Sequence, residues 1–186
     1  NKFTLFNGYC PKKGCDPSII NNLGSTPTYT PIMRYAEVLL SYLEALNESQ
    51  PSTIDQNILD LTINDIRNRV KLTDIKKADV PTQELVREAI RKERRVELAF
   101  EGLRYYDVLR WEIAEKELNH TFTGVKLSDD PNARNYRGSG TAASPVDENM
   151  YYQFEKRTWS SHNRYFPIPQ NDLNVNKNLK QNTGYN

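Results

Sequence analysis

The sequence predicts a mainly α-helical fold, with tetratricopeptide-like helical hairpins, long irregular loops and a coil-rich C-terminal extension. Three observations predict it. Apolar residues recur at helical spacing within 31–118, short turn-forming segments separate the helical stretches, and Asn, Ser, Gly and Pro become frequent after residue 119. We therefore expect a loop segment at 1–30, the helical hairpins at 31–118, and an irregular region with scattered aromatic residues at 119–186 that packs on the helices.

Two amphipathic stretches joined by a short polar turn predict the first hairpin. Thr30 and Pro31 suit an N-cap and a first helical position, so the first helix is expected at 32–47. The turn Asn-Glu-Ser-Gln-Pro follows, and the second helix is expected at about 53–70. Because the connection is short, the two helices should pack antiparallel.

The second hairpin follows the same plan. Pro81 and Thr82 open a third helix that should reach Glu101, and Gly102 marks its end. A fourth helix is expected at 103–118. Two successive hairpins are typical of helical solenoids, although the spacing of small and aromatic residues fits the tetratricopeptide pattern poorly.

Composition excludes several classes of function. Lys and Arg total 25 and Asp and Glu total 24, so the net charge is +1. This balance gives no basis for a nucleic-acid partner or for binding an anionic membrane surface. Hydrophobic residues make up only 37% of the chain, which indicates long loops or a fragment whose core is completed by another segment. No stretch is apolar enough to span a bilayer.

Metal and hydrolase motifs are missing from the sequence. Cys10 and Cys15 bracket CPKKGC, but a zinc site needs about four ligands, and His120 and His162 show no ligand spacing. The sequence leaves open whether the cysteines form a local disulfide or remain free thiols. The two histidines also accompany no nucleophile motif, so a hydrolytic triad is not expected. No cofactor is expected.

Two acids interrupt the apolar stripe of the predicted third helix. Glu93 and Glu97 lie among Val86, Ile90 and Val96 on the helical wheel. A carboxylate on a core-facing stripe is costly unless it is paired and hydrogen-bonded. The acids are therefore either a catalytic pair or structural ion pairs that fix how the helices dock.

We favour the structural interpretation of Glu93 and Glu97. Two carboxylates one helical turn apart, about 6 Å between their Cβ atoms, could in principle cleave a glycosidic bond. A general acid needs a raised pKa, whereas arginines crowd this region and would keep both acids ionised. The expected partners lie on several helices: Arg34, Arg67, Arg104 and Arg110.

Aromatic residues in the loops are the candidate ligand-binding residues. Flat rings beside amide and guanidinium groups suit sugars, because the ring covers apolar C–H faces while polar groups bind hydroxyls. The alternative is that these rings anchor the irregular segments on the helices. The candidates lie among Asn, Arg and Ser: Tyr29, Tyr136, Tyr151, Tyr152 and Trp159.

Four segments resemble one known family in their order and spacing. They are PIMRYAEVLLSYLEALNE, IRNRVKL, REAIRKERRVELAFEGLRYYDVLRW and RYFPIPQNDLNVNKNLKQNTGY. Together they resemble the C-terminal portion of the SusD-like (RagB/SusD) outer-membrane nutrient-binding lipoproteins. The N-terminal half and the lipid-anchoring cysteine of that family are not found here. Where the family usually ends in Asn-Pro-Gly-Tyr, this chain has Thr at position 183.

The resemblance implies a protein that binds its ligand without cleaving it. Proteins of this kind lie on the surface of the outer membrane of Bacteroidetes and cover a SusC-like TonB-dependent transporter. They capture glycans or peptides for import, and their fold is mainly helical. The expected partners are a glycan or another nutrient and the transporter, with membrane contact only through a lipid anchor. The alternatives are a peptide-binding SusD-like protein, a helical-repeat interaction scaffold, and more remotely a glycosidase using Glu93 and Glu97.

Overall fold

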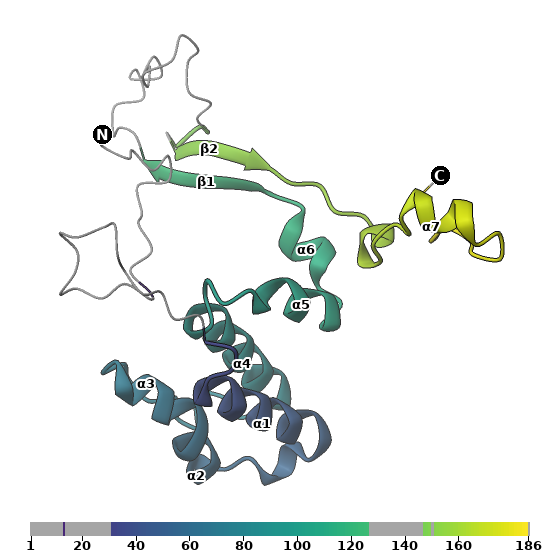
Figure 1. Ribbon diagram of the computed structural model, residues 1–186. Coiled ribbons are helices and arrows are strands. Elements are labelled where there is room, and N and C mark those ends of the chain that lie inside the picture. Colours follow the sequence, from purple (N-terminus) through teal and green to yellow (C-terminus); the bar gives the residue numbers. More distant parts are fainter. Residues whose placement is uncertain (1–12, 14–30, 127–146, 150, 186) are drawn as a thin grey trace, which may run out of the picture. The chain divides into compact units, whose positions relative to one another are not determined.

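The computed structural model in Figure 1 describes residues 13, 31–126, 147–149 and 151–185. The described residues are mainly helical, with one two-stranded sheet among them, which confirms the prediction of a mainly α-helical fold. The chain divides into two compact units at Tyr106 and Asp107. Each unit is described separately below.

The core of the first unit lies where α1 (Tyr35–Ser49) packs against α4 (Gln83–Glu97). The chain between them forms a 3-10 turn at Pro51–Thr53, the short helices α2 (Gln56–Leu59) and α3 (Asp65–Arg69), and a π-helical turn that joins these two at Asp60–Asn64. Burying each large apolar side chain contributes about 1.5–3 kcal/mol. The most deeply buried come from α1, α2, the π-helical turn and α4: Leu40, Leu43, Leu59, Ile63, Val86 and Ile90.

The first helix begins later than the sequence predicts. Arg34 is its N-cap, with an extended backbone (ψ 153°), and Ile32, where the helix was expected to begin, precedes it and is 100% exposed. The Arg34 side chain hydrogen-bonds to Glu97, the last residue of α4, and to Glu101, four residues after it. The expected start was wrong because this long-range ion pair, which the local capping pattern does not reveal, accompanies an extended conformation at Arg34.

The predicted helix at 53–70 is divided in the structure. Asp55 is the N-cap of α2, and its Oδ1 accepts a hydrogen bond from the Ile58 N–H at 2.9 Å. The π-helical turn, whose hydrogen bonds span five residues instead of four, then separates α2 from α3. Its buried Thr62 donates its hydroxyl to the Ile58 carbonyl at 2.6 Å. The wheel pattern predicted the helical character of this segment but not its interruption.

Left-handed residues end two helices earlier than expected. After α4 ends at Glu97, Phe100 has φ 65° and Gly102 has φ 79°, so the helix does not reach Glu101. In the predicted helix at 103–118, Glu112 has φ 56° and separates α5 (Leu103–Arg110) from α6 (Ala114–Leu118). A positive φ is unfavourable for non-glycine residues, and nothing in the local sequence predicts it at Phe100 or Glu112.

The C-terminal region contains regular structure where the sequence predicted coil. Strand β1 (Thr121–Lys126) pairs antiparallel with β2 (Tyr151–Lys156), with Thr121 opposite Lys156. Aromatic and β-branched residues favour such strands, but both are short. A 3-10 turn at Ser161–Arg164 and α7 (Gln170–Val175) follow. Pro169 is the N-cap of α7, so the helix begins immediately after a proline.

Gly184→Ala is expected to destabilise the C-terminal segment more than Gly102→Ala destabilises the first unit. Both glycines have positive φ, 95° and 79°, which costs an alanine about 1–2 kcal/mol. A Cβ at Gly184 would also clash with the Cβ of His162, whereas no described atom lies within 4 Å of one at Gly102. Hydrogen exchange of residues 160–185 and of residues 95–106, respectively, measures the two effects. Equal losses would show that the contact with His162 is unimportant.

Candidate functional site

Of the candidate aromatic residues, the structure describes Tyr151, Tyr152 and Trp159, and it does not bring these three onto one surface. Tyr29 and Tyr136 lie outside the described residues. Tyr151, 40% exposed, and the half-buried Tyr152 are neighbours on β2, where successive side chains point to opposite faces. They therefore cannot form a single stacking platform with Trp159, which follows the strand.

Trp159 is held in place by an asparagine from the end of α6. The Asn119 Nδ2 donates to the Trp159 carbonyl at 2.9 Å, and the Asn119 Oδ1 accepts from the Trp159 N–H. This pair of bonds fixes the backbone that carries the indole ring. The ring is half-buried, and its Nε1 is buried without a hydrogen-bond partner among the described residues.

A small pocket lies beside the indole of Trp159. Its volume is about 230 Å³, below the ~300–1,000 Å³ typical of sites for drug-sized ligands. Arg164 Nη1 donates to Glu112 Oε1 at 2.8 Å, and this bond raises the pKa of the Arg164 guanidinium. An aromatic ring beside a carboxylate and a guanidinium can bind one sugar ring. The lining residues are Leu109, Glu112, Ala114, Glu115, Trp159, Ser161 and Arg164.

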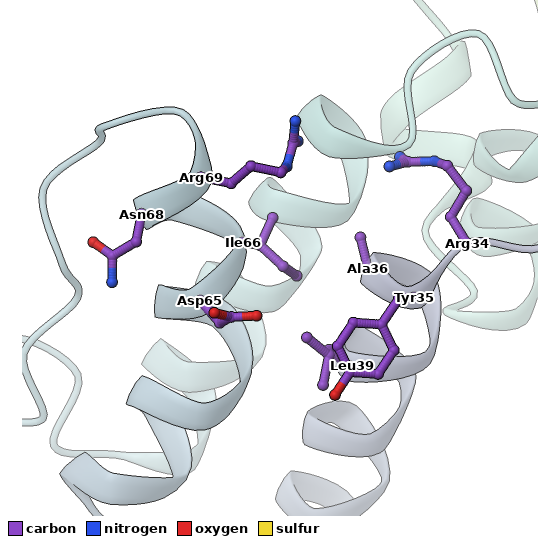
Figure 2. A pocket seen from close by; sticks show the side chains of 8 residues that line it. All are labelled: Arg34, Tyr35, Ala36, Leu39, Asp65, Ile66, Asn68 and Arg69. Atoms are coloured by element: carbon purple, nitrogen blue, oxygen red, sulfur yellow. The ribbon is translucent and has the colours of Figure 1, made fainter.

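A larger groove of about 610 Å³ lies between α1 and α3 in the first unit. Figure 2 shows Tyr35 and Leu39 of α1 directed toward Asp65 and Ile66 of α3. Leu39 and Ile66 are buried, at 8% and 4% exposure, whereas Tyr35 is 70% exposed. The groove therefore combines an apolar floor with an exposed ring and a carboxylate. Its lining is completed by Arg34, Ala36, Asn68 and Arg69.

The groove arginines are tied to the end of α4. Arg34 donates from Nε to both carboxylate oxygens of Glu101 at 3.0 Å and from Nη1 to Glu97 Oε1 at 2.8 Å. Arg69 Nη2 donates to both oxygens of Glu97 at 2.8 Å. The hydrogen bond to Glu101 is the main cause that raises the pKa of Arg34. Burial raises the pKa of Glu101, but hydrogen bonds from Arg34 and Lys13 outweigh it and the net pKa is lowered.

The other arginines near the interrupted stripe have different partners. Glu93 is buried, and its Oε2 accepts from Arg67 Nη1 at 2.7 Å. Arg110 pairs with Asp107 on its own helix, at 2.9 Å from Nη2 to Oδ1. Arg104 lies half-buried in the first turn of α5. Guanidinium donors thus occupy oxygens of both Glu93 and Glu97, which leaves these acids badly placed to protonate a glycosidic oxygen.

Sequence reasoning missed Tyr35 as a groove residue. On the helical wheel of the predicted first helix, Tyr35 shares one wide apolar face with Leu39 and Leu43. The structure exposes Tyr35, Val38 and Tyr42, at 70%, 46% and 52%, as a separate stripe on α1. Their spacing of three and four residues was the available signal, since it marks a second apolar face.

The described residues contain neither a metal-binding cluster nor a membrane-spanning helix. No three His, Cys, Asp or Glu side chains in the described ranges are grouped so that they could hold a metal ion. Every helix in the described part of the chain is too short or too polar to cross a lipid bilayer.

Comparison with known proteins identifies the family. The model of the SusD family matches residues 1–185. SusD-like protein P2 of Formosa agariphila is 34% identical over 117 residues, which are 60% of this chain and 22% of that protein. A solved SusD-like carbohydrate-binding protein of Bacteroides fragilis is 35% identical with a TM-score of 0.66, over 86% of this chain and 30% of that chain. A second SusD-like structure from that species is 34% identical with a TM-score of 0.61, over 83% of this chain and 25% of that chain.

The chain thus spans less than a third of the length of these relatives. Because the family model covers nearly the whole chain, the protein belongs to the SusD family.

Proposed function

We propose that the protein binds carbohydrate without cleaving it. The observation that carries this proposal is the similarity to the SusD-like carbohydrate-binding protein of Bacteroides fragilis, at 35% identity and a TM-score of 0.66. Identity at this level over most of the chain supports a shared ligand class. The chain spans only 30% of that structure, so the complete binding site can include further residues.

The geometry around Trp159 supports carbohydrate binding. Asn119 fixes its backbone from both sides, so the ring needs little ordering when a ligand arrives. The pocket beside it holds the ion pair of Glu112 and Arg164, whose polar atoms suit sugar hydroxyls. Tyr29, Tyr136, Tyr151 and Tyr152 remain further candidates of the same chemistry.

Binding without cleavage also fits the hydrogen bonds that Glu93 and Glu97 of α4 accept from arginines. Glu97 accepts hydrogen bonds from Arg34 and Arg69, and Glu93 accepts one from Arg67. These contacts suit docking of helices rather than proton transfer. Within this proposal a SusC-like TonB-dependent transporter receives the captured ligand, and the protein is a lipoprotein at the surface of the outer membrane. Family membership supports both statements.

Isothermal titration calorimetry against a panel of neutral and acidic polysaccharides and of peptides tests the proposal. We expect at least one carbohydrate to bind and Trp159→Ala to weaken it about tenfold. That value follows from losing about 60 Å² of ring contact at about 25 cal/mol per Å², or about 1.5 kcal/mol. Trp111→Ala is the matched control, because Trp111 does not line the pocket. Peptide binding with no carbohydrate binding would overturn the proposal.

A further inference from the structure

We propose that the groove between α1 and α3 binds an uncharged oligosaccharide and discriminates against acidic glycans. The inference rests on the proposed function, because it names a second contact site and the class of carbohydrate that fits it. The groove is larger than the Trp159 pocket, at about 610 Å³ against 230 Å³. Its volume falls within the ~300–1,000 Å³ typical of ligand sites, so it can hold several linked sugar units.

The two sides of the groove match the two kinds of surface on a sugar. Tyr35 offers a ring that is 70% exposed, and Leu39 and Ile66 form an apolar floor beside it. Apolar C–H faces of a pyranose can lie against these groups. Asp65 faces them from α3 and can accept hydrogen bonds from hydroxyls.

The charges of the groove disfavour an acidic ligand. Both arginines that line it are bound to Glu97, and Arg34 is bound to Glu101 as well. An anionic sugar would have to compete with these carboxylates. Asp65 is exposed and has no ion pair with any described residue. Asp65 is therefore the carboxylate that remains available in the groove. Its negative charge attracts hydroxyl donors but repels a uronate or a sulfate ester.

Glycan pairs that share a backbone and differ in charge test this selectivity. The probes are β-1,4-mannohexaose with the β-1,4-mannuronate hexamer, and cellohexaose with the β-1,4-glucuronate hexamer. In each pair a C6 hydroxymethyl group becomes a carboxylate. We expect at least one neutral member to bind about threefold or more tighter than its acidic partner at low salt, with the ratio shrinking in 0.5 M NaCl. Asp65→Asn should reduce the ratio, whereas Glu88→Gln on the exposed face of α4 should not.

Substitution of Tyr35 locates the binding in the groove. Tyr35→Ala should weaken the neutral oligosaccharide about tenfold, while Tyr35→Phe, which keeps the ring, should retain most of the affinity. Tyr42→Ala is the control, because Tyr42 lies on the same helix at 52% exposure but does not line the groove. Circular dichroism checks that each variant is folded.

The outcomes separate this inference from the proposed function. Tighter binding of the acidic members, no binding of either pair, or equal effects of Tyr35→Ala and Tyr42→Ala would overturn the groove assignment. The proposed function stands in all these cases if another carbohydrate of the calorimetric panel binds. A panel without any bound carbohydrate overturns both. Capture of a helical peptide in the groove in place of the oligosaccharide would also contradict the inference.

Discussion

Glu97→Ala is expected to lower the free energy of unfolding of the first unit by about 2–3 kcal/mol. The Glu97 side chain is only 11% exposed and accepts hydrogen bonds from Arg34, which precedes α1, and from Arg69 in α3. Removing the acid leaves two guanidinium groups close together without their shared anion. Breaking a fully buried pair costs about 3–5 kcal/mol, and the value here is lower because the Arg69 side chain is 58% exposed.

Urea denaturation followed by far-UV circular dichroism measures the loss of stability. Tryptophan fluorescence would report on the second unit instead, because both Trp111 and Trp159 lie there. Glu84→Ala is the matched control on the same helix. Glu84 also pairs with an arginine, Arg87, but it is 61% exposed, so its removal should cost at most about 0.5 kcal/mol. Similar losses for Glu84→Ala and Glu97→Ala would contradict the view that the ion pairs of Glu97 dock three elements together.

The helical core was predictable because its signal is local and periodic. Val86 and Ile90 recur one turn apart on α4 and are both 1% exposed. Thr82 was also a readable signal, since its hydroxyl caps α4 by accepting from the Leu85 N–H at 3.3 Å. Such features depend on residues within one or two turns of each other, which the sequence displays directly.

Long-range partners could not be predicted in the same way. The acids at 93 and 97 were visible on the apolar stripe, but which arginine meets which acid depends on how the helices pack. Arg69, for example, lies 28 residues before Glu97. The positive φ values at Phe100 and Glu112 could likewise not be predicted from residue type, because neither residue is a glycine.

The groove shows the same limit for the candidate site. A wheel pattern predicts that Tyr35 lies on an apolar face, but not that α3 lies opposite and leaves the ring exposed. Trp159 was predictable as a loop aromatic residue. Its clamp by Asn119 was not, because the two residues are 40 positions apart.

Asn64→Ala is expected to destabilise the first unit by about 3 kcal/mol. Asn64 is 0% exposed and lies in the π-helical turn. Its Nδ2 donates to Asp60 Oδ1 at 2.7 Å and to the Ile75 carbonyl at 3.0 Å, and its Oδ1 accepts from the Ile75 N–H at 2.7 Å. Each bond contributes about 1 kcal/mol, and the substitution leaves the half-buried backbone of Ile75 without its amide partner.

The loop from Leu72 to Val80 should respond most strongly, because Asn64 docks its centre at Ile75. Gln56 makes a second, weaker bond to the same carbonyl at 3.2 Å, so the loop should loosen rather than detach. The Ile75 amide should then exchange its hydrogen at least tenfold faster than in the unsubstituted protein. Asn57→Ala, at an exposed position of α2, should change stability by no more than about 0.5 kcal/mol. If Asn64→Ala were equally mild and left exchange at Ile75 unchanged, the amide would not be what holds this loop on the core.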